Sequence, residues 1–133
     1  FTLYQYYRNF AISCEGKEEF SEAVEFFKKA VEYANDNQKM NLYYTILSLY
    51  EIDLKQPREA LTYYELYKQS LQTYYGQLLK IENPDRTDQG EINVTRNKLD
   101  ALDKHINGLR KSLGLIGFAG SNVKVLSSIN INL

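Results

Sequence analysis

The side chains that could do chemistry are few in this sequence of 133 residues, and they lie far apart. It holds one cysteine, Cys14, and one histidine, His105. A zinc site needs about three or four ligands at set spacing, and a catalytic nucleophile needs a base within hydrogen-bond reach. This pair predicts neither, so we expect no enzymatic activity, no cofactor and no bound metal. We interpret Cys14 as a small buried hydrophobe, the usual role of a free cysteine.

Two short motifs resemble functional ones but lack the context that such motifs need. Gly114, Gly117 and Gly120 could be mistaken for a phosphate-binding loop, yet their spacing differs, no strand precedes them and no Lys-Ser/Thr pair follows. Asn93-Val94-Thr95 matches a glycosylation acceptor, which without a secretory signal is more often a chance match. Neither motif predicts a site.

Composition and charge restrict the classes of partner. The formal net charge is −1 and the charged residues are interleaved, whereas a duplex-binding module normally carries a basic stripe. We therefore expect no direct nucleic-acid partner. No apolar run approaches the roughly 20 residues that span a bilayer, and no signal-peptide pattern is present. We expect no membrane span and a cytoplasmic location.

Hydrophobic periodicity predicts an all-α chain with room for one domain. Apolar residues recur at helical spacing in five stretches, separated by breaks rich in Gly, Asn, Asp or Pro. Pro57 is well placed to begin the fourth helix. We expect helices at about residues 3–15, 21–34, 39–54, 57–81 and 91–113.

This pattern predicts four segments: helical hairpins over 1–82, a linker over 83–90, a long helix over 91–113 and an irregular or β-like tail over 114–133. Within the tail, Ile129–Leu133 alternates with period two, as a half-buried strand does. Such a strand could pair with another chain, pair with sequence outside this one, or be disordered. Because the sequence opens at Phe1 inside a helical pattern, we expect it to be part of a longer polypeptide.

The predicted last helix carries a heptad pattern. Seven positions step alternately by three and four residues, which is typical of a coiled-coil seam. The positions are Ile92, Thr95, Leu99, Leu102, Ile106, Leu109 and Leu113. The six apolar ones could pair with a second copy of the chain, giving a homodimer, or fold back on the fourth helix. His105 flanks the seam, and we expect it to be solvated.

Two stretches of the sequence share one pattern. Phe20–Ala30 and Pro57–Tyr67 each read aromatic or proline, two polar residues, Ala, aliphatic, polar and two aromatics. Ala60 follows Ala23 by 37 residues, a spacing found in helical-hairpin repeats. Such repeats stack into binding surfaces.

Residues 4 to about 70 resemble tetratricopeptide repeats. The first hairpin supplies the signature positions Tyr7, Phe10, Ala11, Cys14, Phe20, Ala23, Phe27 and Ala30. The resemblance implies that the small residues Ala11, Ala23 and Ala30 lie where helices cross closely. It also implies that the large residues Tyr7, Phe10 and Phe27 fill the gaps between helices. The second is a looser match, through Tyr44, Leu47, Ser48, Ala60, Tyr64 and Tyr67. Its Tyr50 is one position away from the family's aromatic slot, which leaves the register of the third helix open.

The resemblance implies an α–α superhelix whose concave groove binds a protein or peptide partner. The groove residues that it implies are Gln5, Arg8, Ile12, Asn41, Thr45, Ser48 and Ile52. Members of the family that bind chaperones hold a terminal carboxylate with Lys and Asn residues. Only Arg8 is basic at a matching place here, and Ile12 stands where Asn is expected, so we expect no chaperone tail as ligand.

From these patterns we expect a non-enzymatic interaction module that binds a peptide or helix of a partner. One alternative is a ligand- or peptide-sensing regulatory domain, whose heptad helix dimerises and signals to an output domain of a larger transcriptional or signalling regulator. A second alternative is an architectural segment of a larger assembly. In an interaction module, Arg8 could hold a carboxylate of the bound peptide, although exposed charges are by default only solvated.

Overall fold

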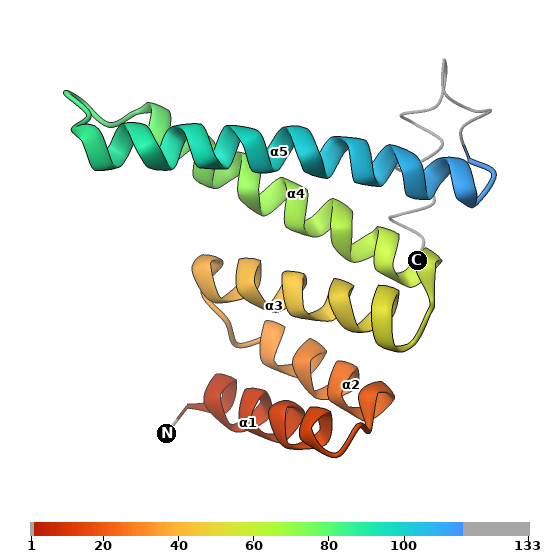
Figure 1. Ribbon diagram of the computed structural model, residues 1–133. Coiled ribbons are helices and arrows are strands. Elements are labelled where there is room, and N and C mark those ends of the chain that lie inside the picture. Colours follow the sequence, from red (N-terminus) through yellow and green to blue (C-terminus); the bar gives the residue numbers. More distant parts are fainter. Residues whose placement is uncertain (1, 116–133) are drawn as a thin grey trace. The chain divides into compact units, whose positions relative to one another are not determined.

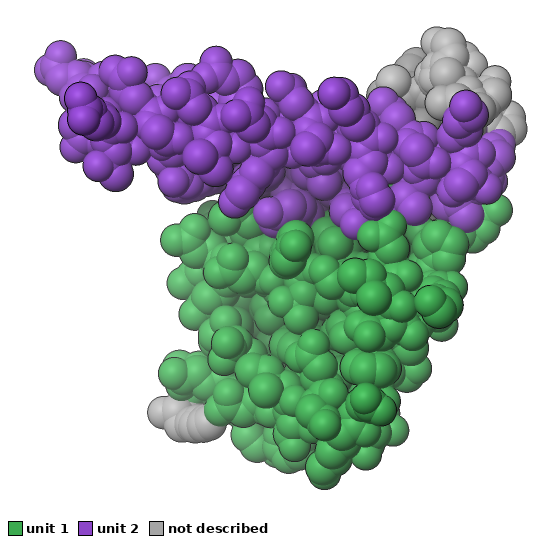
Figure 2. Space-filling model, in the orientation of Figure 1, with its two compact units in different colours: residues 1–63 green, residues 64–133 purple. Residues whose placement is uncertain are grey.

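The computed structural model describes residues 2–115, and these residues form helices joined by short turns, with no strand among them. The prediction of an all-α chain is confirmed. The chain divides into two compact units, residues 1–63 (green in Figure 2) and residues 64–133 (purple). The boundary between the two units falls inside one long helix. The predicted strand at 129–133 and the glycines at 117 and 120 lie outside the described residues.

In the first unit, α1 spans Leu3–Gly16 (Figure 1). Its ends are set by side-chain and backbone caps. Thr2 and Gln5 form a capping box, in which each side chain accepts a hydrogen bond from the other's backbone N–H. At the other end the left-handed residue is Glu18, with φ 60°, rather than the nearby glycine. The N–H of Glu19 bonds to the carbonyl of Cys14 at 2.9 Å, which completes a Schellman-type turn into α2 (Phe20–Val31).

Small residues allow α1 and α2 to cross closely. Ala11, Ala23 and Ala30 are each 0% exposed, as the resemblance implies for positions where helices meet. The helices are antiparallel, since the rings of Phe10 and Phe26 stack 5.3 Å apart while Tyr7 stacks on Tyr33, nearer the other end of α2. Phe10 stacks on Phe26 of α2, yet it stays 44% exposed, so it fills a gap between the helices only in part.

The third helix begins and ends differently from the prediction. It starts at Asp36, because Asn35 and Gln38 form a second capping box, so α3 spans Asp36–Ser48. The chain then continues as a π-helical turn, η1 (Leu49–Asp53), with the N–H of Leu54 bonded to the carbonyl of Leu49 at 2.8 Å. This wider turn rotates Tyr50 and its neighbours about the helix axis. It therefore determines which faces of the helix these residues occupy, which is the register that the sequence leaves open.

An amine and two phenol rings join α2 to the following helices within the first unit. Lys28 Nζ lies 5.3 Å from the ring centre of Tyr50 and 5.9 Å from that of Tyr63, at cation–π distance. Burial disfavours the charge on Lys28, but its hydrogen bond with Tyr50 and its attraction to both phenols outweigh this effect, so its pKa lies above the usual 10.5. For Tyr63 burial acts in the opposite direction and raises the pKa above 10.0, because it disfavours the charged phenolate.

The fourth helix, α4 (Pro57–Leu79), begins at the predicted proline, and the last, α5 (Arg86–Ser112), begins earlier than predicted. Asp85 accepts a hydrogen bond from the N–H of Asp88 at 2.7 Å, and Asp88 accepts one from the N–H of Asp85. This capping box makes residues 86–90 helical. The expected linker at 83–90 is therefore wrong in its second half, and the turn between the two helices is short.

Within the second unit, α4 and α5 run antiparallel, and the heptad seam folds back on α4. Tyr64 contacts His105, Lys68 pairs with Asp103 at 2.6 Å and Tyr74 donates a hydrogen bond to Glu91 at 3.1 Å. Three seam residues are buried, namely Thr95, Leu102 and Ile106. The other four seam positions, Ile92, Leu99, Leu109 and Leu113, are half-buried. The chain itself covers the three buried residues of the predicted seam.

Gly114 ends α5 in the left-handed conformation, with φ 78°, which glycine adopts without strain. The N–H of Leu115 bonds to the carbonyl of Arg110 at 2.7 Å, which gives the same type of turn as the one after α1. No helix within residues 2–115 combines the length and apolar character needed to cross a bilayer.

Candidate functional site

A cavity of about 310 Å³ lies in the first unit where α1, α2 and α3 meet. Four residues of α1, one of α2 and three of α3 line it. They are Tyr4, Arg8, Ile12, Glu15, Phe27, Asn41, Leu42 and Thr45. The α1 residues are spaced by four, four and three, so a single face of that helix forms one side of the cavity. The volume is at the lower end of the range of small-ligand pockets, about 300–1,000 Å³.

The floor of the cavity is apolar and part of the core. Phe27 and Leu42 are each 3% exposed, so most of their surface packs against the protein and only an edge faces the cavity. Ile12 is 42% exposed and forms an apolar side of the opening. An apolar group that enters here leaves water and contacts three hydrophobic side chains, which is the favourable term in binding.

Four polar side chains surround this floor. The Arg8 guanidinium is exposed and the Glu15 carboxylate is half-buried. Thr45 donates its hydroxyl proton to the carbonyl of Asn41 at 3.1 Å, which leaves its oxygen able to accept a bond. Asn41 is exposed and offers both a donor and an acceptor. The eight lining residues hold no nucleophile–base pair.

The structure brings together four of the seven residues that the resemblance implied. Arg8 and Ile12 of α1 meet Asn41 and Thr45 of α3 at the cavity, although at least 29 residues of sequence separate the two pairs. The other three do not line it. Gln5 is held in the α1 cap by Thr2, Ser48 lies at the last residue of α3, and Ile52 is 64% exposed on the π-helical turn.

Sequence analysis missed the other four lining residues, Tyr4, Glu15, Phe27 and Leu42. Glu15 was given no role. The usable signal was its spacing of seven from Arg8, which returns to nearly the same helical face. Phe27 was recognised only as a signature position of the repeat, and Leu42 was given no role.

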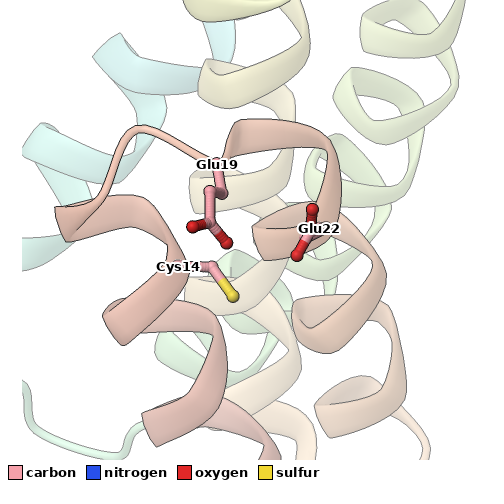
Figure 3. Close-up of side chains that lie close together, drawn as sticks. All are labelled: Cys14, Glu19 and Glu22. Carbon is pink, nitrogen blue, oxygen red and sulfur yellow. The ribbon is translucent and has the colours of Figure 1, made fainter.

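The turn between α1 and α2 also brings Cys14, Glu19 and Glu22 together (Figure 3). The thiol sulfur and the carboxylate oxygens lie within 4.8 Å of one another, a proximity that the sequence spacing did not predict. Both glutamates are exposed, Glu19 at the N-cap of α2 and Glu22 in its first turn. Negative charge is favourable at a helix N-terminus, which accounts for the two carboxylates without any ligand.

Neither a protein-family model nor a curated protein nor a solved structure matches this chain. The resemblance to tetratricopeptide repeats therefore stays a prediction from the residues, and the geometry of the cavity carries the functional argument.

Proposed function

We propose that this protein is a non-enzymatic protein–protein interaction module, and that a peptide segment of a partner binds in the cavity formed by α1, α2 and α3. One observation carries the proposal. Four groove residues chosen from the sequence line one cavity with an apolar floor and a polar rim. This combination is typical of sites where apolar contacts supply affinity and a few polar groups fix orientation.

In this proposal the helix pairs are tetratricopeptide-like hairpins. The buried alanines of the α1–α2 crossing and the buried Ala60 at the start of α4 support it, since small residues occur where such helices meet. The alternative of a regulator that dimerises through its heptad helix has less support. Leu102 and Ile106 are 7% and 1% exposed, so they are not available to a second copy while unit 2 is folded.

The test compares two double variants with the wild type in affinity capture from a lysate of the source cells. Arg8→Glu with Thr45→Glu changes the cavity. Arg58→Glu with Thr73→Glu is the matched control, because Arg58 is also exposed and Thr73 also bonds its hydroxyl to the carbonyl four residues earlier, at 3.1 Å. Equal melting temperatures would show that both variants are folded.

We expect a partner protein that the wild type and the control capture and that the cavity variant loses. Each tenfold loss of affinity is about 1.4 kcal/mol, which one reversed charge and one blocked contact can readily supply. A partner retained by the cavity variant would contradict the proposal and would direct attention to another surface.

A further inference from the structure

Two opposite charges line the α1 side of the cavity. Arg8 and Glu15 are seven residues apart on α1, so they share nearly one helical face and are separated by about 10 Å along the helix axis. Among residues 2–115 the ion pairs involve other side chains, so no residue of this range forms an ion pair with Arg8 or Glu15. A bound partner can therefore complement both.

The surface between the two charges is apolar. Ile12 lies between Arg8 and Glu15 in the sequence, and Phe27 and Leu42 form the floor beneath. A ligand that fits places an apolar group in the middle, an acidic group toward Arg8 and a basic group toward Glu15. A ligand with two like charges would set one of them against a like charge of the protein, which opposes binding and gives selectivity.

The polar rim suits an extended ligand better than a helical one, because a helix already pairs its own backbone amide groups. A polyproline II segment has three residues per turn and a rise of about 3.1 Å, so side chains three residues apart share a face at about 9 Å. That spacing is close to the separation of the two charges on α1.

The backbone of such a segment forms no internal hydrogen bonds, so its amide groups need partners. Asn41 at the rim offers one donor and one acceptor, which match a peptide group. We infer that the cavity selects an extended peptide segment in which a basic and an acidic residue, three positions apart, flank an apolar one. This inference rests on the proposed function and specifies its ligand.

The test is selection from a displayed library of random octapeptides. The wild type should enrich peptides with one basic and one acidic residue three apart around an apolar residue. Arg8→Glu should enrich two basic residues at those places, and Glu15→Lys two acidic ones. The variant that carries both changes should again enrich one of each, in the reverse order along the peptide. Arg58→Glu and Glu18→Lys, which alter exposed charges outside the cavity, should enrich the wild-type pattern.

Fluorescence polarisation with the enriched peptides then gives the size of the effect. Each charge-reversed variant should bind its own peptide at least about tenfold more tightly than the wild-type peptide. If the enriched peptides lose binding in the Arg8→Glu, Thr45→Glu variant but carry no charge pattern, this inference is wrong and the proposed function stands. If no enriched peptide loses binding in the Arg8→Glu, Thr45→Glu variant, both fail.

Discussion

The α1–α2 pair and the α4–α5 pair are both antiparallel, yet different side chains hold them together. Alanines that are completely buried form the crossing of α1 and α2, with Ala11 from one helix and Ala23 and Ala30 from the other. The second pair is held by branched side chains such as Leu102 and Ile106. Ion pairs and hydrogen bonds flank this second seam, whereas aromatic rings flank the first.

The difference predicts opposite sensitivities. Where two backbones approach over alanines, the structure has no room for a larger side chain, because protein interiors are packed as densely as organic crystals. Where large aliphatic residues fill the seam, truncation leaves a cavity and removes buried apolar surface. Each of the following substitutions tests one side of this comparison.

The largest effect is expected for Ala23→Arg in the α1–α2 pair. Ala23 is 0% exposed, so an arginine there must either separate the helices or bury an unpaired charge. We expect the free energy of unfolding to fall by more than about 3 kcal/mol, with loss of helicity in the first hairpin, measured by circular dichroism and urea denaturation. Ser21→Arg, on the exposed face of the same helix, is the control and should change little. An unchanged melting temperature for Ala23→Arg would refute the close crossing.

A smaller loss is expected for Leu102→Ala in the α4–α5 pair. Leu102 is 7% exposed, and truncation of a buried leucine typically costs about 2–5 kcal/mol. Because the chain itself covers this residue, the melting temperatures of wild type and variant should not depend on protein concentration. Val94→Ala, at a residue that is 49% exposed on the same helix, should cost far less. A melting temperature of the wild type that rises with concentration would show that the seam, or another surface, pairs two copies.

Much of the fold was predictable because its signals are local. Periodicity predicted the helices, Pro57 the start of α4 and the alanines the crossing of α1 and α2. The start of α5 was missed although Asp85 and Asp88 have the spacing of a capping box, so that error was avoidable. The π-helical turn was missed for a physical reason. Its hydrogen bonds span five residues instead of four, and no residue type requires that spacing.

The candidate site was predictable only in part. Arg8 and Asn41 were found through the repeat resemblance, which relates positions on different helices. Periodicity alone relates positions within one helix, so it cannot show which faces of α1 and α3 meet. Glu15 was hidden because a charged residue near a helix end is usually a solvated or capping group. Its place beside Arg8 in the lining of the cavity depends on how α1 packs against α2 and α3, which the sequence does not show.

The smallest effects concern the polar flank of the α4–α5 seam, where burial should decide between two ion pairs. Glu65 and Arg110 form a pair whose side chains are 15% and 21% exposed, whereas in the Lys68–Asp103 pair the carboxylate is 51% exposed. Arg110→Met leaves the Glu65 carboxylate without its cation in a poorly hydrated place. It also removes Arg110 Nε, which is buried without a hydrogen-bond partner within residues 2–115.

We expect these two changes to offset in part, with a net loss of about 1 kcal/mol for Arg110→Met in urea denaturation. Lys68→Met should cost about 0.5 kcal/mol or less, because exposed ion pairs contribute little. Changing Glu65→Leu together with Arg110→Met should restore nearly wild-type stability, since a buried ion pair is often no better than apolar residues of similar size. If Lys68→Met proved as costly as Arg110→Met, burial would not be what separates the contributions of the two ion pairs.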